Sequence, residues 1–169
     1  MGTLVARLAA TAIGETYNQY AHAPHLRERL DRYLAERTDA PILLVGEAAG
    51  YRGARVSGLP FTSERQISGS GPAEATATIV HRVLREFGLE HTVLLWNVVP
   101  THPGSAQTNR RPTRAEIAAG LPFARELARG RRVVAVGRVA EHALDAPYVR
   151  HPSHGGAAAF REALLEWST

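Results

Sequence analysis

The stretch Pro41-Ile-Leu-Leu-Val-Gly46 is a continuous apolar run that ends at a glycine. Such a run is typical of a strand in a parallel sheet that is covered on both faces, because its side chains are then buried on either side. The same pattern returns at residues 92–99 and 132–137, with a shorter and weaker strand at residues 147–150. The chain therefore predicts four strands.

Helical patterns alternate with these strands along the chain and cover residues 3–12, 24–37, 72–87, 113–129, 139–144 and 156–167. Thr113 and Glu116 form a capping box at the start of the fourth of these helices, and Gly88 is placed to end the third. Alternation of this kind predicts a three-layer α/β/α sandwich with a short, mainly parallel four-stranded sheet. Because the sequence has no internal repeat and no linker, we expect residues 1–169 to form a single domain.

The composition excludes several classes of chemistry. The chain has 169 residues and no Cys, which excludes a disulfide framework, a thiolate metal site, a cysteine-ligated iron–sulfur cluster and a Cys nucleophile. A chain without Cys suits a reducing cytoplasm. No apolar run is long enough for a membrane span or a secretory signal, so we expect a cytoplasmic protein with no membrane partner.

The charge balance favours basic residues. Lys+Arg of 20 against Asp+Glu of 16 gives a formal net charge of +4, and the basic residues are Arg, whose planar guanidinium suits bidentate phosphate contact. Charge alone leaves two interpretations open. One is a polyanionic partner, and the other is a biased usage of Arg, Ala and Gly.

Unusual residues gather where the predicted strands end. They lie in the loops at residues 46–53, 100–104 and 151–156, and Asn97 is a polar residue inside an otherwise apolar strand. In open parallel sheets, ligands bind beyond the carboxyl ends of the strands. We therefore expect these loops to converge on one crevice.

Several chemistries are poorly supported by the residues of this crevice. The glycine spacing is wrong for a dinucleotide-binding turn, and no Gly-rich segment carries the lysine of a nucleotide triphosphatase. His151 and His154, joined by His102, have a spacing that could bind a metal, but no carboxylate cluster accompanies them. Ser153 lacks the strained turn of a hydrolase nucleophile. We therefore expect neither a metal nor a cofactor.

Five short segments resemble, in order, the motifs of the uracil-DNA glycosylase superfamily. Gly46-Glu-Ala-Ala-Gly50 is similar to the first motif, in the form closest to the family 4 enzymes that carry an iron–sulfur cluster. Gly58-Leu-Pro-Phe61 is similar to the segment that holds the aromatic ring stacked on the base. Leu95-Trp-Asn-Val-Val99 is similar to the strand whose Asn reads uracil, and Asn109-Arg-Arg-Pro112 to the element after it. His151-Pro-Ser153 is similar to the second catalytic motif.

The resemblance extends from residue 41 to residue 167 and has two departures. Family 4 members hold their cluster with four Cys, whereas this chain has none and carries Thr101 where the exit of the Asn strand would have one. Ala49 replaces the usual Pro of the first motif. Gly50 stands in place of the bulky residue that excludes the thymine methyl group in some families, so we expect incomplete rejection of thymine.

The resemblance implies an enzyme of DNA base excision repair that hydrolyses the N-glycosidic bond of uracil, or of other deaminated bases, in DNA. Glu47 would orient or deprotonate the water and favour the sugar cation, and His151 would donate a hydrogen bond to O2 of the leaving base. Asn97 would read the N3–H and O4 edge of uracil, and Phe61 would stack on the base. The other residues of the base pocket would be Gly46, Ala48, Gly50 and Tyr51.

An enzyme that acts on a base in DNA must turn that base out of the stack and hold the neighbouring phosphates. The residues that would make these DNA contacts are Ser63, Arg65, Arg110, Arg111, Ser153, His154 and Gly155. The loop at residues 154–156 is small and polar and lacks an apolar wedge for the vacated stack. We therefore expect a monomer that prefers uracil in single-stranded or mismatched DNA.

Two other functions stay open at this point. One is an N-glycosidase or binding protein for a free nucleoside or nucleotide, and the other is an inactive nucleic-acid-binding module in which Ala48 and Ala49 mark decay of the first motif. The site residues also have structural interpretations: Glu47 as a turn cap, Asn97 as the anchor of a loop, and Phe61 as core filling. Steep loss of activity with added salt would favour a DNA enzyme over a nucleotide enzyme.

Overall fold

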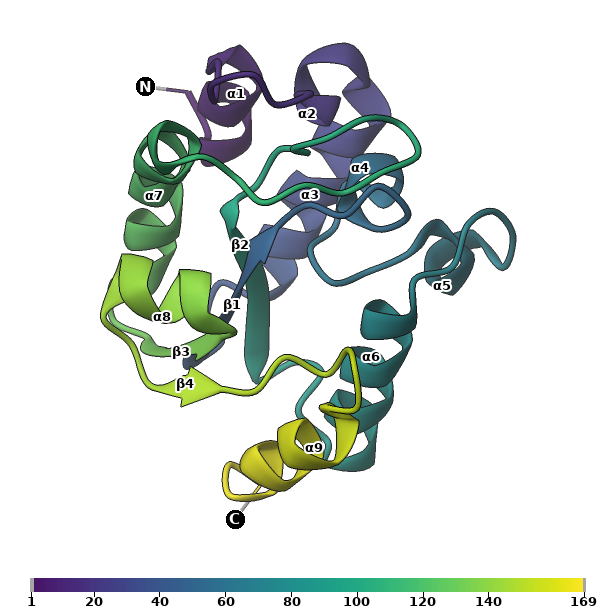
Figure 1. Ribbon diagram of the computed structural model, residues 1–169, viewed down its shortest axis with the longest axis vertical. Helices are drawn as coiled ribbons and strands as arrows, with labels where there is room; N and C mark the ends of the chain where they lie inside the picture. The colour runs from purple at the N-terminus through teal and green to yellow at the C-terminus, as the bar shows by residue number, and fades with distance from the viewer. Residues whose placement is uncertain (1, 169) are drawn as a thin grey trace.

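The computed structural model describes residues 2–168, and its centre is a four-stranded sheet in which all neighbouring strands are parallel (Figure 1). The sheet has the order β2-β1-β3-β4, formed by β1 (Ile42–Ala48), β2 (Val93–Val99), β3 (Arg132–Val136) and β4 (Tyr148–Val149). The predicted α/β class and the four strands are confirmed. The first strand is longer than predicted, because β1 continues past Gly46 and includes Glu47.

The longer helices follow the predicted pattern, with ends that differ by at most three residues. They are α1 (Leu4–Ala10), α3 (Pro24–Glu36), α6 (Ala75–Glu86), α7 (Arg114–Ala128), α8 (Arg138–Leu144) and α9 (Ala157–Leu165). The capping box of Thr113 and Glu116 is present at the start of α7. Three short helices were not predicted, and they are α2 (Gln19–His22), α4 (Ala54–Ser57) and α5 (Glu64–Ser68).

The helices cover the sheet from both sides. In Figure 1, α7 and α8 lie on one side of the sheet, and α6 and α9, which contact each other, lie on the other. Helix α3 contacts the edge strand β2 through Tyr33, whose hydroxyl accepts a hydrogen bond of 2.8 Å from the backbone N–H of Leu95. Burial raises the pKa of this tyrosine to about 12, so its hydroxyl stays protonated. Within residues 2–168, no helix is long and apolar enough to span a membrane.

One glycine brings α7 close to β2. A Cβ atom on Gly120 would lie 2.3 Å from the carbonyl oxygen of Val98, a separation that no side chain could tolerate. The helix and the strand are therefore in backbone contact at this point. This contact packs α7 against the strand, and the loop between β2 and α7 passes over the carboxyl end of the sheet.

Candidate active site

A cleft of about 470 Å³ opens at the carboxyl ends of β1, β2 and β4. Its volume is within the usual range for a small-molecule site. The loops after these strands line it, together with the segment between α4 and α6. Of the predicted site residues, the cleft brings together Glu47, Ala48, Gly50, Phe61, Asn97, Arg110, Arg111, His151, Ser153 and His154.

Gly46 allows two of these side chains to meet. It pairs in register with Asn97 on the neighbouring strand. A Cβ atom on Gly46 would lie 2.4 Å from Cζ of Phe61 and 2.8 Å from Oδ1 of Asn97. The absence of a side chain at this position therefore lets the aromatic ring and the amide lie side by side over the end of β1.

The amide of Asn97 is nearly buried and has no protein partner. Its exposed fraction is 4%, and within residues 2–168 its side chain makes no hydrogen bond to another residue. Neither polar atom of the amide is sealed from solvent, because both reach the open cleft. A ligand in the cleft can supply the missing hydrogen bonds, so the amide is available for recognition.

Phe61 has a strained backbone. Its φ of 51° lies in the left-handed region, which costs about 1–2 kcal/mol for a residue with a side chain. Such strain persists where the surrounding structure holds the residue in place. The ring is 8% exposed, lines the cleft and contacts Gly46, so the strain aims it at the site.

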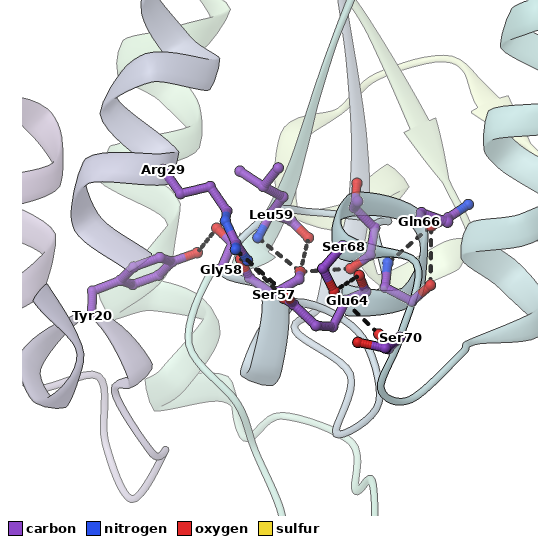
Figure 2. Close-up of polar contacts among 11 residues, drawn as sticks. Tyr20, Arg29, Ser57, Gly58, Leu59, Glu64, Gln66, Ser68 and Ser70 are labelled. Atoms are coloured by element: carbon purple, nitrogen blue, oxygen red, sulfur yellow. Dashed lines mark hydrogen bonds and ion pairs between the residues drawn. The ribbon is translucent and has the colours of Figure 1, made fainter. Parts of the chain in front are cut away.

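A polar network holds the segment on which Phe61 lies, and Figure 2 shows part of it. The hydroxyl of Ser57 donates to the carbonyl oxygen of Thr62 at 2.6 Å, and the hydroxyl of Tyr20 donates to the carbonyl oxygen of Gly58 at 2.9 Å. Arg29 donates to the carbonyl oxygen of Ser57 at 2.8 Å and also pairs with Glu64 at 2.7 Å. Side chains from α2 and α3 thereby fix both sides of the turn.

His151 is held in one tautomer. Its Nδ1 accepts a hydrogen bond of 3.2 Å from the backbone N–H of Ser153 and lies 2.6 Å from the hydroxyl of the same residue. Since a backbone N–H can only donate, Nδ1 carries no proton, and the neutral ring keeps its proton on Nε2. Burial, and then the charge of His154, lower the pKa of His151. The cleft therefore holds a neutral imidazole that can donate through Nε2.

Glu47 is a half-buried carboxylate in the same cleft. Burial raises its pKa, while the positive charge of Arg111 acts in the opposite direction. A carboxyl group with a raised pKa takes up a proton more readily than an exposed one. Glu47 is thus suited to accept a proton from water or to stabilise a nearby cation.

Three of the predicted DNA contacts lie elsewhere. Ser63 is fully buried at the start of α5, where its backbone N–H and its hydroxyl donate to Oε1 of Gln66 at 2.9 and 3.2 Å. The prediction that Ser63 contacts phosphate is therefore wrong, because its hydroxyl is used in a helix cap. Arg65 and Gly155 are exposed but do not line the cleft, and Arg65 donates to the carbonyl oxygen of Gly71 at 3.0 Å.

Tyr51 also lies outside the lining of the cleft. Its backbone N–H donates to Oδ1 of Asn109 at 2.9 Å, and the guanidinium of Arg52 lies 5.3 Å from the centre of its ring. Its role as a wall of the base pocket stays a prediction. Its contribution is to join the loop after β1 to the loop after β2.

Arg110 is engaged in an ion pair. Its guanidinium donates to both oxygens of Glu116, at 2.7 and 2.9 Å, and the carboxylate of Glu116 is buried. This pairing neutralises the charge of Arg110, although its side chain still borders the cleft. Arg111 has no ion pair within the described residues, so it is the better candidate for phosphate contact.

Glu74 lines the cleft and was not predicted from the sequence. Its carboxylate lies against the backbone of Gly50 and Gly53. Burial raises its pKa. The only sequence signal for it was indirect, because two glycines three residues apart leave room for a side chain from elsewhere in the chain.

His102 joins the two loops beneath the cleft. Its ring nitrogens lie 2.7 Å from the carbonyl oxygen of Ala49 and 2.6 Å from that of Ser105, and its side chain is fully buried. Both nitrogens therefore face backbone oxygens, to one of which the neutral ring donates, and neither nitrogen is directed at His151 or His154. Among residues 2–168, no group of three or more His, Asp or Glu side chains is arranged to hold a metal ion.

Replacing His102 with Leu should destabilise the protein by about 1–3 kcal/mol, because the buried imidazole donates a hydrogen bond to a backbone carbonyl oxygen and leucine has no donor. Urea denaturation followed by circular dichroism measures this loss. His25→Leu, at an exposed position on α3, is the matched control and should change stability by less than about 0.5 kcal/mol. Equal stability of the two variants would show that His102 does not hold the loops.

The fold and the cleft together define an α/β protein with a small polar binding site at the carboxyl ends of parallel strands. The family model of the uracil DNA glycosylase superfamily matches residues 34–165. The chain therefore belongs to the uracil DNA glycosylase superfamily. None of the curated proteins matches the chain.

Two solved structures are similar to this chain. Wild-type SMUG2 from Pedobacter heparinus has a TM-score of 0.67 and 13% sequence identity, covering 99% of this chain and 97% of that chain. Wild-type UNG from Nitratifractor salsuginis has a TM-score of 0.47 and 17% identity, covering 99% and 92%. At this identity, the likeness to SMUG2 shows a shared fold.

Proposed function

We propose that the protein is a monofunctional DNA glycosylase that removes uracil from DNA in base excision repair. The unpartnered amide of Asn97 carries this proposal. An amide offers one acceptor and one donor, which match the N3–H and O4 of uracil, whereas cytosine offers the reversed pattern. The superfamily to which the chain belongs supports the same substrate class.

In the proposed complex, the base leaves the DNA stack and lies on the ring of Phe61. Oδ1 of Asn97 accepts the N3–H, its Nδ2 donates to O4, and Nε2 of His151 donates to O2. As the bond between C1′ and N1 breaks, its electron pair passes to the base, and negative charge develops on O2. The hydrogen bond from His151 strengthens as this charge grows, which lowers the barrier.

Glu47 acts on the sugar side of the bond. Its carboxylate stabilises the positive charge that develops on the sugar and orients a water molecule toward C1′. The water oxygen bonds to C1′, and the proton that it loses passes to the carboxylate. The products are the free base and an abasic site in the DNA.

The phosphate contacts fall to polar side chains that border the cleft. We assign them to Arg111, Ser153 and His154, which line it together. The loop around His154 carries no apolar wedge, so the preferred substrate is single-stranded or mismatched DNA bound by one copy of the chain. Binding through phosphates also makes activity fall with added salt.

The experiment that tests this function measures single-turnover release of uracil from a single-stranded oligonucleotide, with free deoxyuridine assayed in parallel. The parent protein should release uracil from DNA and act weakly on the nucleoside. Asn97→Ala should slow the release by about 100-fold, because the site loses its hydrogen bonds to the base. Asn97→Asp should shift the preference toward cytosine, since a carboxylate accepts from the cytosine amine.

Gln107→Ala is the control, because Gln107 is an exposed amide outside the lining of the cleft. Its rate should equal that of the parent protein. If both Asn97 variants release uracil within a few-fold of the parent rate, the base is read elsewhere. If deoxyuridine is the better substrate, the protein is an N-glycosidase of free nucleosides.

A further inference from the structure

A carboxylate fills the space beside Gly50 where a side chain of that residue would lie. A Cβ atom on Gly50 would be 2.5 Å from Oε2 of Glu74, and one on Gly53 would be 2.4 Å from the same oxygen. Gly50 does not have a positive φ, so the backbone conformation does not require glycine there. The carboxylate of Glu74 is what a side chain at residue 50 would have to displace.

Glu74 is held by packing and not by a cation. It directly precedes α6 and, within residues 2–168, its carboxylate makes no hydrogen bond or ion pair with another side chain. Its pKa is raised by burial alone, whereas Arg111 partly offsets the same effect at Glu47. A half-buried carboxyl group of this kind, facing a cleft with no assigned partner, is available to a ligand.

The order of atoms around the ring of the base indicates which of them faces the carboxyl group of Glu74. This inference rests on the proposed function, in which O2 of the base faces His151, and N3 and O4 face Asn97. C5 is the next ring atom after the one that bears O4, and it comes against the wall formed by the loop after β1. Gly50 and Glu74 make that wall, and Ala54 lies beside them in the cleft lining.

We propose that Glu74 is the specificity-determining residue of this site, whose carboxyl group faces C5 of the base and excludes a methyl group there. Uracil then enters the cleft and thymine does not. The expectation from Gly50 alone was incomplete rejection of thymine, because the residue has no side chain. In the fold, a residue 24 positions further along the chain occupies that space.

Space and solvation both oppose the methyl group. It would need the volume that the carboxyl group occupies, and it would remove water from that group without replacing the lost hydrogen bonds. Rejection of a single methyl group by a shaped pocket is worth about 10–200-fold. An effect of this size is measurable as a ratio of two rates.

The test compares single-turnover release of thymine and uracil from otherwise identical single-stranded oligonucleotides. Glu74→Ala should raise the thymine-to-uracil rate ratio at least about tenfold over the parent, because the wall is removed. Glu74→Gln should keep the ratio within about threefold, because glutamine fills the same space. An unchanged ratio in Glu74→Ala overturns the proposal, and so does an equal rise in both variants.

A second variant keeps the test independent of any general loosening of the fold. In the double variant Gly50→Ala with Glu74→Ala, the new methyl group on residue 50 occupies part of the vacated space. Its thymine-to-uracil ratio should fall below that of Glu74→Ala. If the ratio stays as high as in Glu74→Ala, filling this space does not exclude the methyl group, and the proposed role of Glu74 is wrong.

Binding of the free bases separates this inference from the proposed function. In a ligand-observed NMR titration, the parent should bind uracil more tightly than thymine, and Glu74→Ala should bind both alike. If the binding follows this pattern but no base is released from DNA, the glycosylase function fails and the role of Glu74 stands. If uracil is released but neither the rate ratio nor the binding changes, the role of Glu74 fails alone. If there is neither binding nor release, both fail.

Discussion

Replacing His151 with Ala should slow single-turnover uracil release by about 10²–10³, and Glu47→Gln should slow it by a similar factor. His151 stabilises the leaving base through Nε2, because Nδ1 is engaged by Ser153. Glu47 acts on the opposite side of the bond that breaks. Because the two groups stabilise different charges in the transition state, either loss alone should be large.

Binding measurements distinguish these roles from a general defect. Fluorescence anisotropy with a uracil-containing single strand should give nearly the same affinity for both variants, since neither residue contacts phosphate in the proposed complex. His142→Ala, which changes an exposed imidazole outside the cleft, should leave the rate unchanged. Near-normal activity in Glu47→Gln together with lost DNA binding in His151→Ala would favour an inactive nucleic-acid-binding module.

The pH profile of the parent protein follows from the same two groups. Burial raises the pKa of Glu47 above 4.5, and burial together with His154 lowers the pKa of His151 below 6.5. Activity requires the carboxylate and the neutral ring, so it should fall as the pH drops through these two pKa values and stay level above them. In Glu47→Gln, the remaining loss of activity at low pH should follow the protonation of His151 alone.

Glu116→Ala should lower the free energy of unfolding at pH 7 by about 2–4 kcal/mol. The carboxylate of Glu116 is buried and accepts four hydrogen bonds, two from Arg110, one from the backbone N–H of Thr113 and one from that of Glu15. Its loss leaves the loop after β2 without its anchor on α7. Uracil release should therefore fall as well, because Arg111 follows directly on the anchored residue.

The stability of the parent protein should depend on pH through the same carboxylate. The guanidinium of Arg110 is the largest of the causes that lower the pKa of Glu116 from 4.5 to about 2. The stabilisation, roughly 3 kcal/mol, is fully present above the unfolded pKa and is lost as the pH falls from about 4.5 through about 2. Urea denaturation at several pH values measures it.

Glu162→Ala is the matched control for this prediction, because Glu162 is exposed on α9. It should change stability by less than about 0.5 kcal/mol at every pH. If Glu116→Ala unfolds at the same urea concentration as this control, the buried ion pair does not hold the loop.

The sequence was sufficient to predict strands and helix ends where the local pattern of residues agrees with their burial in the fold. Apolar runs identified the four parallel strands, and the capping box of Thr113 and Glu116 identified the start of α7. The ends of the strands also located the cleft, because loops after parallel strands meet at one edge of the sheet. Asn97 could be singled out from the sequence because a polar residue within a buried strand needs a hydrogen-bond partner.

The short helices show where local pattern was insufficient. Helices of four or five residues, such as α4 and α5, are not stable by themselves in water, so their residues carry no periodic signal. Contacts from distant segments hold them, including the pairing of Arg29 with Glu64 and the hydrogen bond from Tyr20 to Gly58. Ser63 was misassigned because the capping-box spacing of Ser63 and Gln66, although present in the sequence, was not recognised as the start of a helix.

By itself, the sequence determined the α/β class and the place of the cleft at the strand ends, because these depend on patterns within one segment. Only the tertiary structure decided which side chains meet across the cleft. It placed Glu74 against Gly50, engaged Arg110 with Glu116 and set Nδ1 of His151 against Ser153. The physical reason is that packing and hydrogen bonding act on distances in space, and these distances are created only when the strands and helices assemble around a common core.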